Sequence, residues 1–361
     1  MSPTNKVPYS LPLLPPPLTT IDVLEKGLVQ LLIKAHKALA ELNGTCRAIH
    51  NPYILLNIPM LQESVASSEI EGIHTTVETA LEEQLKAVDE QDPAGKEALR
   101  YREAIQAGFQ SLTSYSLSTR TVLTIHEKLM PSTGGQFKQQ QNQIAKGRSK
   151  EVIYTPPAPT EVPSLMSNWE NYVHNDGDEV DPLIRVAVSH YQFEAIHPFA
   201  DGNGRTGRIL MVLQIVKDQL LDSPILYLSG YLNKHRDDYY RLLSAVTNEG
   251  KWIDFIKFML QAIGEQAFVT KEVILNMMST REEVKKKLKI DFAAIYSPDL
   301  LEHIFTYPVT YPTHMAEKMG ITYQTASKHL SLLEEGNILS KRKSGRHTLY
   351  YNIPLLACLR T

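Results

Sequence analysis

The sequence has little of several features that mark common classes of protein. Only two of its 361 residues are cysteines, Cys46 and Cys358, and they lie far apart in the chain, unlike a disulfide framework or a metal-binding cluster. No apolar run approaches the length of a membrane span, and prolines stand near the N-terminus where a signal peptide would have its hydrophobic segment. These absences favour a cytoplasmic protein that makes no contact with a membrane.

The chain also lacks an excess of positive charge, since its net charge is −3. Binding to nucleic acid would therefore have to come from a local basic patch. The pattern Gly-x-x-x-x-Gly-Lys-Ser/Thr is absent, which excludes a P-loop nucleotide site. What is present is an ordinary globular composition, 43% apolar, in a chain long enough for two or more domains.

Apolar residues recur at helical spacing through most of the chain, which predicts a mainly α fold. We expect three parts: an N-terminal arm and helix region over 1–75, a helical core over 76–288, and a separate domain over 296–361. The six prolines of residues 1–20 predict an extended arm that lies along the body. Helices are expected at 21–42 (capped by Thr19 or Thr20), 58–72, 76–90, 93–113, 118–130, 161–176, 181–196, from Arg205 onward, 231–248 and 252–288.

One run of twelve residues, His197–Arg208, brings together a histidine, a carboxylate, a Gly-Asn-Gly turn and two arginines. His197 precedes a proline, which disfavours the α conformation, so the helix over 181–196 should end there. The two glycines permit positive φ and leave backbone N–H groups uncovered. The helix expected from Arg205 directs its N-terminus to the same loop, where free N–H groups attract phosphate. The run therefore predicts a phosphate-binding site.

The side chains of this run suit the chemistry of a nucleotide. Arg205 and Arg208 are three residues apart, so they share a helix face and can bracket a di- or triphosphate. Asp201 offers a hard oxygen ligand, as Mg²⁺ requires when one carboxylate and phosphate oxygens hold it. His197 titrates near neutral pH and is the natural general base. The helix that follows is expected to carry an apolar stripe of Ile209, Val212, Leu213, Val216 and Leu220.

This run resembles the signature of the Fic family, His-x-Phe-x-Asp/Glu-Gly-Asn-Gly-Arg-x-x-Arg, and matches it at every defined position. The resemblance covers roughly residues 60–260 and implies a Fic-type helical bundle with a small β-hairpin flap. It implies that AMP is transferred from ATP to a Ser, Thr or Tyr hydroxyl of a protein, with His197 as catalytic base and Asp201 as metal ligand. The residues that we assign to ATP binding on this basis are Glu71, Gly202, Asn203, Gly204, Arg205, Thr206, Gly207, Arg208, Tyr240 and Asn248.

A second motif, Ser67-Ser68-Glu69-Ile70-Glu71-Gly72, ends the helix expected over 58–72, and Gly72 is a good residue to stop it. The motif resembles the inhibitory motif of Fic proteins, Ser/Thr-x-x-x-Glu-Gly/Asn, placed on the same chain and N-terminal to the core. The resemblance implies that Glu71 reaches Arg208 through a bidentate pair and occupies the place of an incoming γ-phosphate. A solvated glutamate at a helix end is the plain alternative, although the helix dipole disfavours a carboxylate there.

Residues 135–157 contain two short β-prone runs around a polar turn, which predicts a hairpin. The segment is similar to the Fic flap, except that Lys138 replaces the common arginine and Ala145 the common glycine. Such a flap would pair with an extended segment of the target and align its hydroxyl by β-augmentation. A surface hairpin without a partner is the alternative.

The end of the helix expected over 231–248 resembles the Fic adenine pocket. An aromatic ring can stack on a base, and the amide of Asn248 can read the edge of a base. Tyr239 and Tyr240 are both candidates for the stacking ring, and we favour Tyr240. A tyrosine that simply packs in the core is the alternative for either one.

Residues 296–361 are expected to form helices followed by two strands around a basic turn. This order is similar to a winged helix-turn-helix, in which the second helix enters the major groove and the wing touches phosphate. That second helix is expected from Thr322 to Glu335, and the turn holds Lys341, Arg342, Lys343 and Arg346. DNA is therefore an expected partner. A protein-binding or dimerisation module is the alternative, which leaves a homodimer open.

The leading hypothesis is a protein adenylyltransferase with ATP as substrate, Mg²⁺ as cofactor and Glu71 as inhibitor. Its partner would be a target protein with an acceptor hydroxyl, or the chain itself. One alternative is a Fic enzyme that removes AMP with the help of Glu71 or transfers another phosphate-bearing group. Another is a DNA-binding regulator whose Fic part only senses nucleotide. His197 and Asp201 together argue against a purely sensory role, because binding phosphate requires no general base.

Overall fold

The computed structural model describes residues 7–18, 24–48, 52–87, 90–146, 151–175, 177, 180–344 and 347–359, without the side chains of 52–56 and 146. The fold is mainly α, as expected, and within these ranges no helix combines the length and apolarity that crossing a membrane requires. The helices are α2 (Lys26–Arg47), α3 (Pro52–Ile70), α4 (Val77–Glu83), α5 (Pro93–Tyr115), α6 (Thr119–Leu129), α7 (Val162–Val173), α8 (Pro182–Ile196), α9 (Asn203–Lys217), α10 (Ser229–Lys234), α11 (Arg236–Glu249), α12 (Trp252–Asp291), α13 (Pro298–Thr306), α14 (Pro312–Met319), α15 (Tyr323–Glu335) and α16 (Ile353–Ala357).

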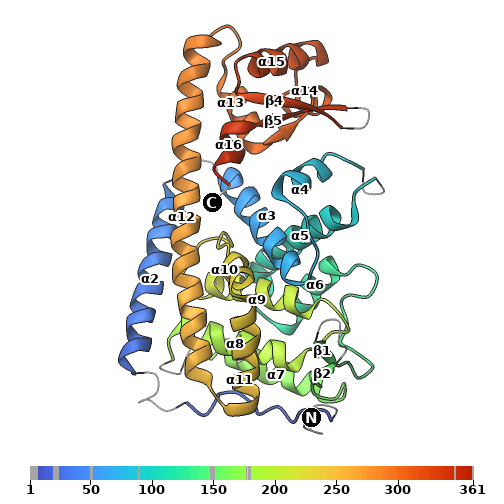
Figure 1. Ribbon diagram of the computed structural model, residues 1–361, viewed down its shortest axis with the longest axis vertical. Helices are drawn as coiled ribbons and strands as arrows, with labels where there is room; N and C mark the ends of the chain where they lie inside the picture. The colour runs from blue at the N-terminus through green and yellow to red at the C-terminus, as the bar shows by residue number, and fades with distance from the viewer. Residues whose placement is uncertain are drawn as a thin grey trace.

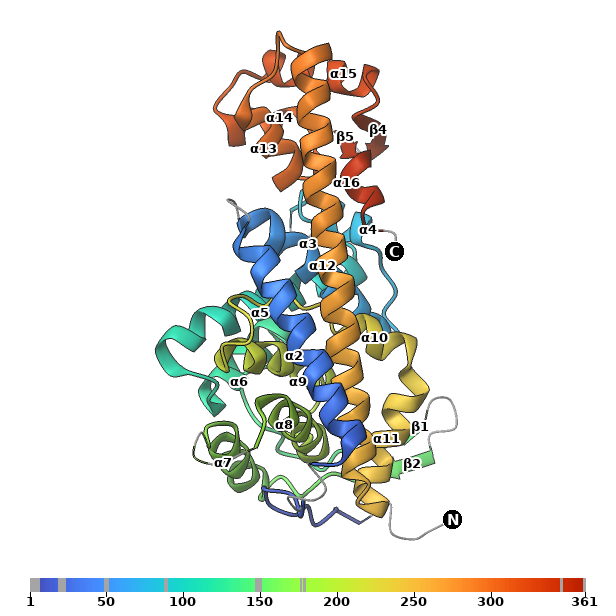
Figure 2. The same ribbon diagram turned by 90° about the vertical axis from the view of Figure 1, so that its left-hand side faces the viewer.

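The 40-residue helix α12 runs along one side of the molecule with α2 beside it, as both views show (Figures 1 and 2). The two helices approach closely where Gly264 faces Ala35, because a Cβ atom on Gly264 would lie 3.4 Å from the Cα of Ala35. Helix α2 begins at Lys26, after the side chain of Glu25 accepts a hydrogen bond from the Gly27 N–H. The expected start at residue 21 is therefore wrong, and the expected caps Thr19 and Thr20 lie outside the described residues.

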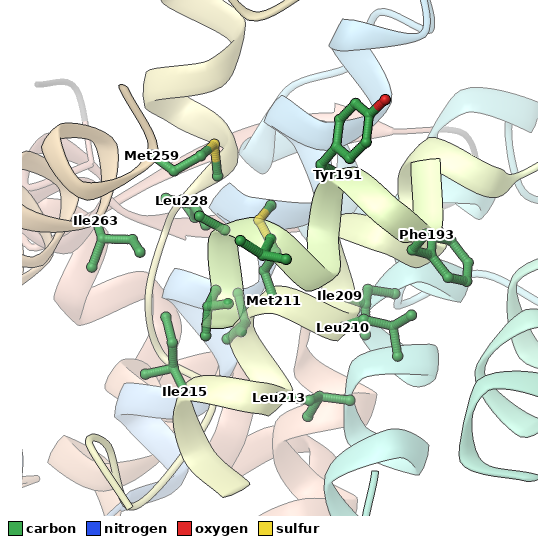
Figure 3. Close-up of a cluster of buried hydrophobic side chains, with 14 of the residues drawn as sticks. Tyr191, Phe193, Ile209, Leu210, Met211, Leu213, Ile215, Leu228, Met259 and Ile263 are labelled. Carbon is green, nitrogen blue, oxygen red and sulfur yellow. The ribbon is translucent and has the colours of Figure 1, made fainter. Parts of the chain in front are cut away.

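Helices α8 and α9 form the centre of the core (Figure 3). Ile209, Val212 and Leu213 of the expected stripe lie in this core, and Val216 and Leu220 pack against it. The other residues of α9 from Arg205 to Ile215 are buried as well, so this part of the helix has no exposed face. Leu220 lies beyond the end of this helix at Lys217. A helix that is apolar on all sides belongs in a core. The motif loop between α8 and α9 is consequently fixed at both ends by the best-packed part of the protein.

The N-terminal arm lies along this core over its described part, residues 7–18. Leu11 and Leu14 are buried in it, and the Leu14 N–H donates to Oδ1 of Asn168, at 2.8 Å. The flap is a hairpin of β1 (Ile144–Lys146) and β2 (Glu151–Tyr154), paired antiparallel. Tyr154 ties β2 to the end of α8, because its hydroxyl donates to the carbonyl oxygen of Ala195, at 2.8 Å. The hairpin is confirmed, and its turn lies outside the described residues.

The single helix expected over 231–248 is two helices, α10 and α11, which meet at His235. A pattern of apolar spacing cannot reveal such a break, because both helices bury one face against α12 and no proline or glycine separates them. After the break α11 packs beside α8, where Tyr239 contacts His190 and Thr247 contacts Tyr191.

The C-terminal elements form a second body above the core (Figure 1). Strands β3 (Val309–Thr310), β5 (His347–Asn352) and β4 (Leu339–Ser344) make an antiparallel sheet in the order β3-β5-β4, and α13, α14 and α15 pack against it. This order of elements agrees with the winged helix-turn-helix interpretation. Lys341, Arg342 and Lys343 are exposed on β4, whereas Arg346 lies outside the described residues.

Helix α12 belongs to both bodies. Its first half packs in the main core, while Met277, Val284 and Leu288 pack with α13, α14 and α15. The boundary that we expected between residues 288 and 296 would assign all of α12 to the helical core. Packing shows that its last turns serve the C-terminal body, so the three expected domain ranges stay a proposal.

Candidate active site

His197 ends α8 in the left-handed conformation, with φ 50° and ψ 59°. Such a backbone is uncommon for a residue with a side chain, and Pro198 disfavours the α-helical alternative. The Nδ1 atom lies 3.3 Å from the carbonyl oxygen of Glu194, which can only accept, so Nδ1 carries the proton and Nε2 presents a lone pair. Burial and the nearby charge of Lys138 lower the pKa of His197 to about 4. The imidazole is therefore a neutral base at physiological pH.

Lys138, at the start of the flap, is a buried cation beside this base. Its Nζ donates to Oδ1 of Asn142 at 2.8 Å, and its backbone N–H donates to the carbonyl oxygen of Pro198 at 2.8 Å. Burial lowers the pKa of Lys138 to about 8. The backbone of Lys138 thus ties the flap to the motif loop, while its side chain bonds within the flap segment.

Gly202 begins α9 with a positive φ of 76°, and no side chain caps the helix N-terminus. Asn203 instead closes the loop, because its side chain accepts from the Phe199 N–H at 2.8 Å and donates to the Phe199 carbonyl at 2.9 Å. The hydroxyl of Thr206 donates to the carbonyl of Gly202, at 2.8 Å. The side chains of Asn203 and Thr206 therefore shape the loop, and the N–H groups of the first turn of α9 are left facing the site.

Asp201 sits in the loop with 72% of its side chain exposed. Its Oδ1 accepts from the Gly202 N–H at 2.6 Å. His126 of α6 holds its backbone: Nε2 lies 2.9 Å from the Asp201 carbonyl oxygen, and Nδ1 accepts from the Gly135 N–H at 3.3 Å. The ring of His126 also stacks on Phe199, with centroids 3.6 Å apart. Asp201, the candidate metal ligand, is thus held through its backbone, and its carboxylate oxygens stay accessible.

Arg208, fully buried on α9, is paired with the candidate inhibitory motif. Its Nη2 donates to Oε1 of Glu71 at 2.8 Å, and its Nε donates to the hydroxyl of Ser67 at 2.7 Å. The expected bidentate pair between Arg208 and Glu71 is therefore a single hydrogen bond. The same Nη2 also donates to the carbonyl oxygen of Ser67, at 3.1 Å. Burial raises the pKa of Glu71, but the charge of Arg208 outweighs it, so the net pKa lies below the usual value.

The carboxylate of Glu71 lies directly over the Gly-Asn-Gly loop. A Cβ atom on Gly204 would lie 2.6 Å from Oε1 of Glu71, so a larger residue there would displace this carboxylate. Gly207 makes a similar close approach, because a Cβ atom on it would lie 2.2 Å from Oε1 of Glu194. The structure thus places an anionic group at the N-terminus of α9, where a phosphate would bind.

Tyr239 and Tyr240 have different surroundings on α11. Tyr239 is buried, and its hydroxyl lies 2.7 Å from Nε2 of His190, so it is a packed core tyrosine. Tyr240 is 43% exposed, and the guanidinium carbon of Arg236 lies 5.8 Å from its ring centroid. Asn248 is two turns further along the same face, and its Nδ2 donates to the carbonyl and the hydroxyl of Ser244, both at 2.9 Å.

Two further groups belong to this site although the sequence did not single them out. Glu97 of α5 pairs with Arg205, and Glu194 of α8 packs under Gly207. Burial raises the pKa of Glu194 to about 7, and its Oε1 is buried without a hydrogen-bond partner among the described residues. Glu97 had no local signal, because it is one of many helical glutamates and stands 108 positions from its partner.

Three models of protein families match the chain. The model described as Fic/DOC family matches residues 116–215, and the one described as Fic/DOC family N-terminal matches residues 29–110. A third, described as Protein adenylyltransferase SoFic-like, C-terminal domain, matches residues 277–355. The chain belongs to the Fic/DOC family. The Fic signature that the sequence analysis recognised lies inside the first of these ranges.

Curated relatives of this Fic chain include two proteins that are named protein adenylyltransferase Fic. The protein from Drosophila mojavensis is 29% identical over 153 residues, which is 40% of this chain and 27% of that protein. The protein from Culex quinquefasciatus is 30% identical over 153 residues, with the same shares. The match thus spans about a quarter of the length of these relatives.

Two crystal structures show the same fold as this Fic chain. A Fic family protein from Desulfovibrio desulfuricans G20 has a TM-score of 0.57 at 20% identity, covering 94% of this chain and 98% of that one. A Fic domain containing signaling protein from Bacteroides thetaiotaomicron VPI-5482 has a TM-score of 0.50 at 17% identity, covering 70% and 96%. The Fic-type helical fold expected from the signature is therefore confirmed.

Proposed function

We propose that this Fic protein is a protein adenylyltransferase that transfers AMP from ATP to a Ser, Thr or Tyr hydroxyl of a target protein. The hydroxyl oxygen attacks the α-phosphorus of ATP, the bond to the bridging oxygen of the β-phosphate breaks, and pyrophosphate leaves. His197 takes the hydroxyl proton on Nε2. The observation that carries this proposal is the placement of a neutral His197 beside the uncapped N-terminus of α9 and both motif arginines.

Each part of ATP has a counterpart in the site. The N–H groups at the start of α9, with Gly202 and Gly204, and the guanidinium groups of Arg205 and Arg208 face the phosphates and stabilise charge on them. Tyr240 stacks on the adenine, and the amide of Asn248 reads its edge. The side chains of Asn203 and Thr206, together with Gly207, act by shaping the loop, since their contacts lie within it or with α8.

Mg²⁺ fits the residues present. Asp201 offers one accessible carboxylate, and the described residues contain no cluster of three or more acidic, histidine or cysteine side chains that could hold a metal alone. That arrangement suits an ion held by one carboxylate and the phosphate oxygens of ATP. When bound there, Mg²⁺ would offset negative charge on the phosphates.

The test is transfer of label from ATP labelled in the α-phosphate, in the presence of Mg²⁺ and a cell lysate. The Glu71→Gly variant should label one or more lysate proteins or the chain itself. His197→Ala in the same background should abolish the label, by about a hundredfold or more, because the general base is lost. Failure of the Glu71→Gly variant to label any protein would contradict the proposal, and label from γ-labelled ATP would indicate a different group transfer.

DNA is the partner that we propose for the C-terminal body. Tyr323, Gln324 and Lys328 are exposed on α15, and basic side chains are exposed on β4 next to it. We expect a gel shift that weakens with salt and is lost in the Lys341→Glu, Lys343→Glu variant, because neutralised phosphates release counterions. An unchanged shift in that variant would place the DNA contact elsewhere, and absence of a shift with the unaltered protein would favour a protein-binding role. The free thiols Cys46 and Cys358 support a reducing, cytoplasmic setting.

A further inference from the structure

Arg205, the first motif arginine, is held by a carboxylate from outside the motif. Its Nη1 donates to Oε1 of Glu97 on α5, in a pair whose side chains are 7% and 22% exposed. At the other end of the guanidinium, Nη2 lies 3.6 Å from Oδ1 of Asp201 and 3.7 Å from the sulfur of Met130. Glu97 therefore binds the arginine from behind, and Nη2 is directed toward the loop that carries Asp201.

The platform that carries Glu97 is itself fixed. Asp92 caps α5 by accepting from the Gly95 N–H at 3.0 Å, and Glu83 accepts from the Asp92 N–H at 2.8 Å. Gly95 packs against the Glu83 side chain, since a Cβ atom on it would lie 2.4 Å from the Cγ of Glu83. Glu97 is thus in the first turns of a helix whose start is tied to α4.

We infer that Glu97 is a positioning residue, which holds the Arg205 guanidinium so that Nη2 faces the phosphates of ATP. The inference rests on the proposed function for the identity of the nucleotide. A free arginine side chain samples many rotamers, and each one that is fixed in advance saves part of the entropy lost on binding. Glu97 holds the guanidinium group through Nη1 and leaves Nη2 for the ligand.

Charge in the site supports this role. The carboxylates of Glu71, Glu97 and Asp201 surround two guanidinium groups, so the site without nucleotide already has a partner for each arginine. An incoming phosphate competes directly with Glu71 for Arg208. It need not displace Glu97, which lies on the side of Arg205 that faces α5. Glu97 and Glu71 therefore have opposite effects: Glu97 promotes nucleotide binding, and Glu71 opposes it.

The test is a double-mutant cycle in the Glu71→Gly background, where the inhibitory carboxylate no longer limits binding. The probe is ATP, measured by calorimetric titration with and without Mg²⁺, together with kcat and KM for AMP transfer. Glu97→Ala should weaken ATP binding about tenfold, as expected for a lost charge-assisted contact. Glu97→Gln keeps an acceptor oxygen and should recover part of that loss. Glu103→Ala, an exposed glutamate on the same helix, is the matched control and should leave binding unchanged.

The decisive comparison is with Arg205→Ala. In that variant Glu97→Ala should cause no further loss of ATP affinity beyond about twofold, because the residue through which it acts is gone. Equal losses with and without Arg205, or a Glu97→Ala effect confined to the melting temperature, would overturn the inference. ATP binding without transfer in the Glu71→Gly protein would contradict the proposed function while the cycle still tests Glu97. Absence of ATP binding in that protein would overturn both.

Discussion

At the scale of single residues, the positive charge of each motif arginine is balanced by a carboxylate from another part of the chain. Arg208 donates to Ser67 and Glu71, and Arg205 donates to Glu97. A buried guanidinium without a partner would be costly, so each arginine needs a carboxylate until nucleotide binds. For Arg208 that carboxylate is Glu71, the residue that we propose as inhibitor. On that proposal, one interaction both stabilises the closed site and excludes the γ-phosphate.

At the residue scale we predict that Glu71→Gln raises AMP transfer. The amide keeps the size of the side chain but loses its charge, which weakens the hydrogen bond from Arg208 and favours the phosphate by about tenfold. Initial rates of label transfer at a fixed ATP concentration measure the effect. Glu69→Gln is the matched control, because Glu69 is two residues away and accepts from Asn233 at the surface instead. Equal rates in the two variants would remove Glu71 as the inhibitor.

At the scale of elements, α3 leads directly to Glu71, the proposed inhibitor, and is anchored near its middle. The carboxylate of Glu63, near its middle, accepts from the Ser229 N–H at 2.7 Å, and the hydroxyls of Ser229 and Tyr101 donate to the other oxygen. Burial raises the pKa of Glu63, and these donors oppose that rise. Because an α-helix rises about 1.5 Å per residue, anchoring Glu63 fixes the position of Glu71 about 12 Å further on.

The flap and the motif loop are also held together by hydrogen bonds. Lys138 donates from its backbone to Pro198, and His126 joins the Gly135 N–H to the carbonyl of Asp201. A target segment that paired with β2 would therefore bind to an element already held against the catalytic loop. If a target binds there as we propose, this arrangement would help to fix the distance between its hydroxyl and the phosphate of ATP.

At the scale of the whole molecule, the C-terminal body packs against the helix that carries the inhibitor. Ile58 of α3 is buried in the core of that body, and Leu61 packs with Leu349 of β5 and Leu356 of α16. The hydroxyl of Tyr351 also donates to Glu82 of α4, the next helix in the chain, at 2.8 Å. The C-terminal body thus packs against the first half of α3, which leads to the proposed inhibitor Glu71.

We therefore expect that loosening this contact raises AMP transfer. Leu349→Ala or Leu356→Ala should lower the free energy of unfolding by about 2–5 kcal/mol and increase the initial rate at least about fivefold. In the Glu71→Gly background the same changes should give no increase. Leu330→Ala, a buried leucine of α15 on the other side of that body, is the control for lost stability alone. A similar rise with Leu330→Ala, or a rise that persists without Glu71, would contradict the coupling.

Much of the local structure could be predicted because its causes are local. Proline restricts the residue before it and glycine permits a positive φ wherever they occur, so the ends of α8 and α3 and the start of α9 follow from neighbouring residues. Apolar spacing likewise predicted α5, α6, α7 and α12. It did not predict the break at His235, nor that α9 is buried on all sides, because both depend on what packs against these helices.

The sequence by itself determined the Fic signature, the inhibitory motif and the identity of the groups that can bind phosphate and move a proton. Those are properties of residues in order along a chain. Only the tertiary structure decided that His197 is kept neutral by burial beside Lys138, that Tyr240 and not Tyr239 is exposed, and that Arg205 is held by Glu97. These are solvent exposures and contacts, one of them between residues 108 positions apart. They exist only once the helices have packed.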